Sequence, residues 1–350
     1  MTSMSIPRAA ASLSVAVGAG LYLLRRRTLS TVAASKPVTF ETLDVFTTTR
    51  FGGNPLAIVY DEQQRLSTDE MQRVAAEFGY SETTFVLPPR DLQNTAWVRI
   101  FSPTAEMPFA GHPNVGTATA LAWRGEVFGR AVSTSVRLEE KAGIVPLDVL
   151  LDSAGKPAGA MLTAPEPFAI PIGSLPVDVV AAAIGVKPAD LNTNHHAPLV
   201  ATTGLPFIVA ELASMDALTR SQGQAATFAQ ARAVGGPLAQ APPKVLAYVR
   251  TGSSGAGAFK IRARMHRSDG TEDAGTGSAN CCLIGLLASL ATSPGVVSAS
   301  ILQGVEMGRP SVLQAEAERK VGSSGAAAVG AVRIGGHCAA VSRGELVGWD

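Results

Sequence analysis

The first half of the chain alternates apolar and polar residues in short runs, a pattern that predicts β-strands. Residues 38–47 form one such run, and the turn Gly52-Gly53-Asn54-Pro55 separates it from a second run at 56–60. Two runs joined by a glycine-containing turn predict a β-hairpin. Further strands are expected at 81–87, 96–101, 136–138, 145–151 and 160–162.

Apolar residues at helical spacing predict only a few helices. Ser67 followed by Glu70 fits a capping box, and Gly79 fits a C-cap at the end of the same helix. A second helix is expected at 113–123, with Pro113 at its first position. The second half of the chain is expected to contain strands near 199–202, 207–211, 245–249, 259–265 and 299–302, a helical tract at 225–234, a loop at 322–330 and a last hairpin at 331–346.

Two stretches in separate halves follow the same plan. Residues 267–290 carry Asp273, then the turn Ala274-Gly275-Thr276-Gly277-Ser278, and then an apolar helix. Residues 106–121 read EMPFAGHPNVGTATAL and align with them when 110–111 is set over 274–275. The pattern predicts a site built from two facing helix N-termini, in a cleft between two similar domains.

Length and composition narrow the class of protein. The 350 residues allow two domains and a leader, with 46% hydrophobic and 16% charged residues. A net charge of +1 argues against nucleic acid as a partner. Three cysteines give no disulfide framework, which favours a reducing compartment. Cys281 and Cys282 fall inside the second apolar helix and are expected to pack in its core.

Residues 1–36 differ from the rest of the chain. They contain several arginines and many alanines and serines, and the first acidic residue is Glu41. This composition predicts a targeting leader, in the first place a mitochondrial presequence. A plastid transit peptide, a secretory signal and an uncleaved membrane anchor are the alternatives, and a cytoplasmic location is the alternative for the protein. No membrane contact is expected after removal of the leader.

Three side chains are candidates for chemistry. Glu82 lies at a helix-to-strand junction, where a carboxylate beside apolar surface gains proton affinity, although a solvated loop glutamate is the plainer interpretation. His112 begins a helix and either stabilises that helix or binds a substrate carboxylate or hydroxyl. Asp273 precedes glycines whose N–H groups could approach an anion. The remaining histidines do not have the spacing of a metal site, and no Gly-x-Ser-x-Gly elbow indicates a serine hydrolase.

Six motifs in order resemble the phenazine biosynthesis PhzF family over about residues 38–347. They are Gly53-Asn54-Pro55-Leu56-Ala57, Ser81-Glu82-Thr83, Phe109-Ala110-Gly111-His112-Pro113, Thr203-Gly204-Leu205-Pro206, Glu272-Asp273-Ala274-Gly275-Thr276-Gly277-Ser278-Ala279, and Gln303-Gly304 with Gly308-Arg309-Pro310-Ser311. The resemblance implies an α+β fold like that of diaminopimelate epimerase. In that fold two similar domains each wrap a curled, mostly antiparallel sheet around a central helix. It places one domain at 38–165 plus 333–347 and the other at 166–332, and it implies a homodimer.

The resemblance also implies the chemistry. Related racemases carry a cysteine at the head of each turn, where this chain has Ala110 and Ala274. The PhzF family instead uses one glutamate as a proton shuttle, which here is Glu82. His112 and Asp273 would hold and polarise the substrate, while Gly111, Gly277 and Ser278 would contact its carboxylate.

The expected reaction is the isomerisation of a small cyclic carboxylic acid resembling trans-2,3-dihydro-3-hydroxyanthranilate, without a cofactor or metal. The alternative is a non-catalytic protein that binds a metabolite or another protein in the same cleft. One departure concerns the substrate: the family has Pro-Ala where this chain has Ala274-Gly275.

Overall fold

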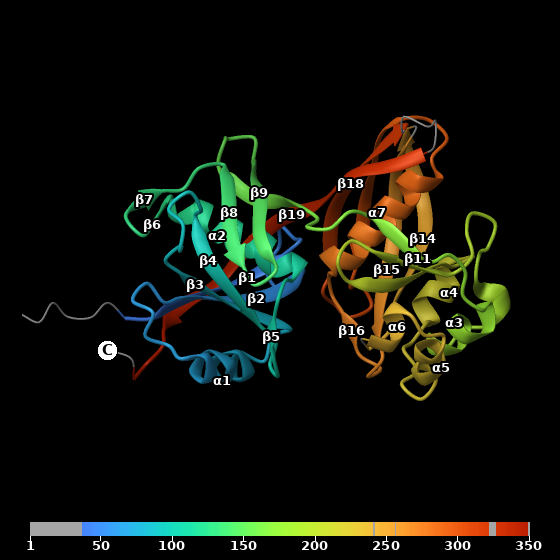
Figure 1. The fold of residues 1–350 in the computed structure, drawn as a ribbon, viewed down its shortest axis with the longest axis horizontal. Coiled ribbons are helices and arrows are strands. Elements are labelled where there is room, and N and C mark those ends of the chain that lie inside the picture. Colours follow the sequence, from blue (N-terminus) through green and yellow to red (C-terminus); the bar gives the residue numbers. More distant parts are fainter. Residues whose placement is uncertain (1–36, 241, 256, 322–326, 349–350) are drawn as a thin grey trace, which may run out of the picture.

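The computed structural model describes residues 37–240, 242–255, 257–321 and 327–348. The ribbon forms two lobes that lie side by side (Figure 1). The predicted leader, residues 1–36, lies outside the described residues. None of the helices in these four ranges is long and apolar enough to cross a membrane.

The N-terminal lobe is a ring of eight strands around one helix. Each strand pairs with the next and the last pairs with the first, so the ring is closed. The enclosed helix is α2 (Gly111–Arg124), whose residues from Gly111 to Leu121 are all buried. The ring contains, in order, β1 (Thr39–Val45), β2 (Asn54–Tyr60), β3 (Glu82–Leu87), β4 (Ala96–Phe101), β8 (Ser135–Glu140), β9 (Gly143–Leu151), β10 (Pro157–Thr163) and β19 (Ala327–Glu345). Outside or beside it lie α1 (Thr68–Phe78), β5 (Glu106–Met107), β6 (Glu126–Val127) and β7 (Arg130–Ala131).

The C-terminal lobe has a sheet that packs against helix α7 (Gly277–Leu290). The helix contacts strands from both halves of this sheet, and its apolar residues form the centre of the lobe. The sheet contains β11 (Ala169–Ile172), β12 (Leu199–Thr202), β13 (Pro206–Glu211), β14 (Lys244–Gly255), β15 (Ala258–Arg267), β17 (Gly295–Gln303), β18 (Ser311–Val321) and the beginning of β19. The other elements are β16 (Glu272–Asp273), α3 (Val177–Ala183), a 3₁₀ turn (Pro188–Asp190), α4 (Met215–Arg220), α5 (Phe228–Ala233) and α6 (Pro237–Gln240).

The order of strand pairing occurs twice. In each lobe a parallel pair (β2–β3 or β13–β14) leads into an antiparallel pair (β3–β4 or β14–β15). A two-residue strand, the central helix and a second parallel pair follow in both lobes. The registers also agree, because Phe101 pairs with Glu106 while His266 pairs with Glu272. Phe101 and His266 therefore occupy corresponding positions, and the expected structural repeat is present. Its alignment differs by two residues from the expected one, because the helix starts at Gly111 and Gly277 correspond, and not Gly111 and Gly275.

Strand β19 belongs to both lobes. Its residues 327–335 pair with β18, and residues 338–345 pair with β1. The prediction of a hairpin at 331–346 is therefore wrong. The predicted loop at 322–330 is also wrong over residues 327–330, which belong to β19. Its other residues, 322–326, lie outside the described residues. Gly335 is not a turn residue but allows β19 to pack closely against β10. A Cβ at this position would collide with the carbonyl oxygen of Ala160 on β10.

The local helix signals were more accurate at some termini than at others. Ser67 and Glu70 form the predicted capping box, and Gly79 ends α1 in the left-handed conformation. Helix α2 starts two residues earlier than expected, so Pro113 is its third residue and not its first. The tract at 225–234 is helical only over α5. Helices α3, α4 and α6 were not predicted, because each is short and depends on packing for its stability.

Candidate active site

The central helices of the two lobes meet end to end at a pocket between the lobes. Gly111 and Gly277 are the first residues of α2 and α7, and both line this pocket. A Cβ on Gly111 would lie 3.2 Å from both Gly277 Cα and Ser278 N, which is tighter than ordinary packing allows. Glycine at position 111 therefore permits the close approach of the helix ends.

Both helix ends leave their backbone N–H groups uncapped by side chains. The N-cap residues, Ala110 and Thr276, make no side-chain capping bond, and neither first turn contains an acidic residue. Two positive helix ends therefore face one pocket, together with N–H donors that a carboxylate can satisfy.

Asp273 is buried beside these helix ends and is held by specific contacts. Its Oδ1 accepts a hydrogen bond from Asn54 Nδ2 at 2.9 Å, and its Oδ2 accepts one from Thr276 Oγ1 at 2.6 Å. Arg267 Nη2 lies 3.5 Å from Oδ1. Burial alone would raise the pKa of Asp273, but Arg267, His112 and the two hydrogen bonds outweigh it and hold this pKa below its ordinary value. Asp273 is therefore a carboxylate at neutral pH.

Glu82 and His112 form the other half of the constellation. Glu82 Oε2 lies 3.6 Å from His112 Nδ1, and the Glu82 side chain is 16% exposed. Among the described residues, no hydrogen-bond partner reaches the buried His112 Nε2. Glu82 is thus at the edge of the pocket, as a group that exchanges protons with a ligand must be, and is not the solvated loop residue of the plainer interpretation.

Asn54 connects the catalytic candidates, although sequence analysis did not select it as a site residue. Its Nδ2 lies 2.9 Å from Asp273 Oδ1, 3.0 Å from Gly275 O and 3.3 Å from His112 Nδ1. The Asn54-Pro55 motif was visible in the sequence, but it suggested a turn, while Asn54 is in fact the first residue of β2.

Gln303 fixes the loop that carries Asp273 to α7. Its Nε2 donates to Asp273 O at 2.8 Å and to Thr276 Oγ1 at 3.0 Å. Its Oε1 accepts from Asn280 Nδ2 at 2.8 Å. Because Gln303 is fully buried, these bonds hold the loop in one arrangement.

Two cations of the C-terminal lobe also line the pocket, and sequence analysis missed both. They are Lys244, the first residue of β14, and Arg267, the last residue of β15, which pair across the two strands. Burial, and then the nearby Arg267 charge, lower the pKa of Lys244. Neither residue stands in a recognisable local motif, because only the pairing of β14 with β15 brings them to the pocket.

The pocket contains all six residues selected from the sequence. Glu82, His112 and Asp273 line it together with Gly111, Gly277 and Ser278. Its walls are completed by apolar side chains, among them Phe109, Phe207 and Met265. Its volume is about 50 Å³, which is room for one or two water molecules. The arrangement seen here is therefore a closed one.

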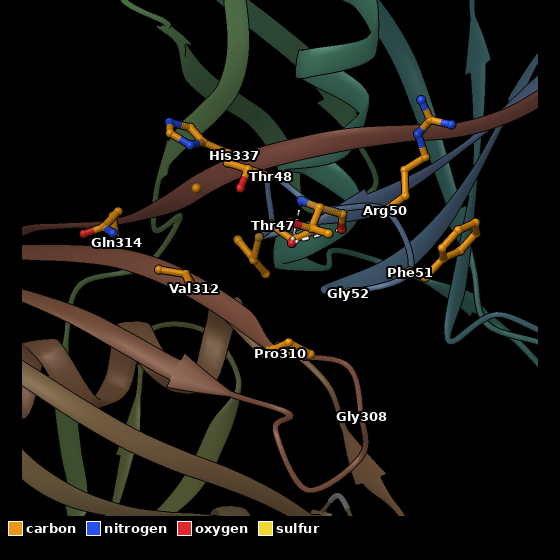
Figure 2. Close-up of a pocket in the computed structure, with 13 residues that line it drawn as sticks. Thr47, Thr48, Arg50, Phe51, Gly52, Gly308, Pro310, Val312, Gln314 and His337 are labelled. Carbon is orange, nitrogen blue, oxygen red and sulfur yellow. Dashed lines mark hydrogen bonds between the residues drawn. The ribbon is translucent and has the colours of Figure 1, made fainter.

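A larger cavity of about 610 Å³ is lined by Phe46, whose ring also approaches Gly275 and Gly277 of the smaller pocket. Thr47, Arg50, Phe51, Pro310, Val312 and His337 are among the residues around it (Figure 2). No aspartate or glutamate lines this cavity, so it lacks the pair of carboxylates present in the smaller pocket. The smaller pocket is therefore the candidate active site.

Comparison with known proteins gives the family context of this site. Residues 43–344 match the family model of phenazine biosynthesis-like proteins, PhzC-PhzF. An uncharacterized isomerase of Mesorhizobium japonicum is 35% identical over 305 residues, covering 87% of this chain and 96% of the relative. The trans-2,3-dihydro-3-hydroxyanthranilate isomerase of Pseudomonas aeruginosa is 33% identical over 307 residues, covering 87% and 97%.

A solved structure supports the fold. The PhzF-family phenazine biosynthesis protein of Bacillus anthracis superposes with a TM-score of 0.73 over 89% of this chain and 99% of the other. At 22% identity this likeness concerns the fold alone. The expectation of a PhzF-like epimerase fold is confirmed at that level.

Proposed function

Because the chain belongs to the phenazine biosynthesis-like (PhzC-PhzF) family, we propose that it is an isomerase that moves a proton within a small cyclic carboxylic acid, without a cofactor. The observation that carries the proposal is the convergence of Glu82, His112 and Asp273 on one pocket with the two uncapped helix ends. Similarity to named isomerases over most of the chain supports it.

Substrate binding would use the helix ends. A carboxylate placed at Gly111, Gly277 and Ser278 would accept hydrogen bonds from backbone N–H groups and would face the positive ends of both helices. This contact fixes the acid end of the substrate and leaves the ring carbons near Glu82.

The proton step would use Glu82 as base and then as acid. Its carboxylate removes a proton from one ring carbon, and the electron pair left on that carbon moves into the adjacent conjugated system. The new carboxylic acid of Glu82 then returns the same proton to another carbon on the same face. Asp273, held ionised by its contacts, and His112 would polarise the substrate and keep it in place.

Opening and closing of the lobes would control access. A pocket of about 50 Å³ does not hold a six-membered ring, so the acid must bind to a more open form. We propose that the lobes act as two domains, 38–165 with 333–347 and 166–332, and that closure excludes water from the proton transfer.

The test follows deuterium exchange by NMR. The P. aeruginosa relative names the first compound, trans-2,3-dihydro-3-hydroxyanthranilate, and other cyclic hydroxy acids extend the panel. In deuterated water the wild type should isomerise a substrate or incorporate deuterium into it, and Glu82→Gln should lose this by about 100-fold or more. Glu77→Gln, on the exposed face of α1, is the matched control and should behave as the wild type. Equal activity of wild type and Glu82→Gln would contradict the shuttle, and no reaction by either protein over the panel would favour the binding protein.

A further inference from the structure

Lys244 is the counterpart of Glu82 in the internal repeat. Thr83 pairs with Phe101 in the N-terminal lobe, and Val245 pairs with His266 in the C-terminal lobe. Since Phe101 and His266 correspond, the residues before Thr83 and Val245 correspond as well. Glu82 and Lys244 thus begin equivalent strands, and both line the same pocket from different lobes. The site therefore has a carboxyl group on one side and an amino group at the related position on the other.

The Lys244 ammonium has no carboxylate in direct contact among the described residues, although Asp273, Glu82 and Asp269 attract it from further away. No carboxylate of the described residues lies within 4.0 Å of its Nζ, whereas Arg267 is 3.5 Å from Asp273. The contact identified for the Lys244 ammonium is the ring of Phe207, whose centroid is 5.7 Å away. Burial and the like-charged neighbour Arg267 outweigh the attraction of these carboxylates, so the charged form of the half-buried Lys244 is disfavoured. An anionic ligand group would offset both effects.

The first carboxylate of a substrate does not fill this role. It has a place at the helix ends, which already offer N–H donors from both lobes. Glu82, on the N-terminal lobe, repels any further anionic group on its side of the pocket, and Asp273, on the C-terminal lobe, is already paired with Arg267. A second acidic group is therefore best placed at Lys244, the cation of the pocket that has no described carboxylate in direct contact.

We propose that Lys244 binds a second acidic group of the substrate, so that the natural substrate of this chain is a small diacid. The inference rests on the proposed isomerase function, because it places the substrate in the same pocket. It gives the two related positions separate tasks: Glu82 exchanges protons with the ring, and Lys244 orients the ring by holding the acid on its far side.

Calorimetric titration with butyrate, succinate and glutarate tests this inference without a known substrate. We expect the wild type to bind a diacid probe about tenfold tighter than butyrate or more, the size of a charge-assisted hydrogen bond. Lys244→Met should abolish this preference, while Lys244→Arg, which keeps the charge, should retain most of it. Lys260→Met, on an exposed position of β15, should leave it unchanged. Circular dichroism and thermal melting confirm that each variant is folded.

Two outcomes overturn the inference. One is a wild type without diacid preference, or a preference that survives in Lys244→Met. The other is a Lys244→Arg variant that binds the diacids but no longer incorporates deuterium, since arginine cannot give up its proton and the lysine would then be an acid–base group. The proposed function fails separately, if Glu82→Gln leaves deuterium exchange intact, and Glu82→Gln should not reduce diacid preference.

Discussion

Glu140 and Gln303 end corresponding strands, β8 and β17, and each lies beside the asparagine on the first turns of its own central helix. Gln303 Oε1 accepts a hydrogen bond from Asn280. Glu140 lies beside Asn114, but its two buried carboxyl oxygens and Asn114 Oδ1 have no partner that meets hydrogen-bond geometry among the described residues. Burial raises the pKa of Glu140 to about 8, and the nearby Asn114 amide offsets this in part. A protonated Glu140 can donate a hydrogen bond to Asn114 Oδ1. The neutral carboxylic acid of Glu140 therefore corresponds to the side-chain amide of Gln303 in the other lobe.

Glu140→Gln should therefore make the protein more stable at neutral and alkaline pH. The pKa is raised from an ordinary value of 4.5 to about 8, so the folded protein binds the proton more tightly. The stability that Glu140 contributes is complete below pH 4.5 and is lost as pH rises to 8. At about 1.4 kcal/mol per pKa unit the loss is on the order of 3–5 kcal/mol.

Urea unfolding at several pH values between 4.5 and 8.5 measures this effect. The difference between Glu140→Gln and wild type should grow with pH over that window. Glu77→Gln, on the exposed face of α1, provides the comparison and should track the wild type. A constant difference across the range would mean that Glu140 is ionised in the folded protein.

Gly111→Ala should impair the site while leaving the fold intact. The added methyl group would press on Gly277 and Ser278 backbone atoms at 3.2 Å, so the two helix ends must move apart by a few tenths of an ångström. Deuterium exchange should fall by about tenfold or more, because small displacements of binding groups reduce rates strongly. Gly173→Ala is the control, since a Cβ there meets nothing within 4 Å. Full activity of Gly111→Ala would show that the contact is not needed.

Arg309→Met should destabilise the protein by about 2 kcal/mol. Arg309 donates to the carbonyl oxygens of Gly52 and Gly53, both at 2.9 Å, and pairs with the buried Asp44 across the lobes. Its removal leaves the Asp44 carboxylate with a backbone hydrogen bond from Phe51 but without a counterion. The estimate lies below that for a fully buried pair because the Arg309 side chain is 29% exposed.

Denaturant unfolding compares Arg309→Met with a matched surface variant. Arg220→Met removes an arginine that also contacts two acidic groups, Asp190 and Asp216, but in an exposed setting. Its effect should be much smaller, since solvent screens exposed pairs. Equal losses for the two variants would refute a special role for the link between the lobes.

The three cysteines should resist thiol reagents until the protein unfolds. Burial raises the pKa of Cys282 and of Cys338 to about 12, and that of Cys281 rises well above its ordinary range. A thiolate is the reactive form, so labelling with a disulfide reagent should be slower by orders of magnitude in the native protein than in urea. Rapid native labelling of any of the three would contradict the packing role. That role agrees with the sequence-based expectation for Cys281 and Cys282.

Local signals predicted the parts of the site that depend on neighbours in the chain. The turn after Asp273 and the segment Gly111-His112 each predict the start of a helix. They can do so because capping and turn formation depend on residues that are close in the chain. Glu82 was a candidate from its place at a helix-to-strand junction, but its role as a proton shuttle was expected only from the resemblance to the family. The roles of these residues in catalysis stay predictions until the variants are measured.

Long-range contacts explain what the sequence could not predict. Asn54 and Asp273 are 219 positions apart and meet only in the folded chain. Lys244 enters the pocket through the pairing of β14 with β15. Strand β19 was expected as a hairpin because glycine is more often a turn residue than a packing residue, and nothing within the segment itself reveals the Ala160 backbone against it.

The double membership of β19 sets an order of events during synthesis on the ribosome. Strand β1 is among the first described segments to be made, yet its partner on one side is the last strand, with 300 positions between Thr42 and Ser342. The N-terminal ring therefore stays open, with two unpaired strand edges, while the whole C-terminal lobe is translated. The segment of β19 that completes the C-terminal lobe is made before the segment that pairs with β1, so the nascent chain has to protect those edges until residues 338–345 emerge.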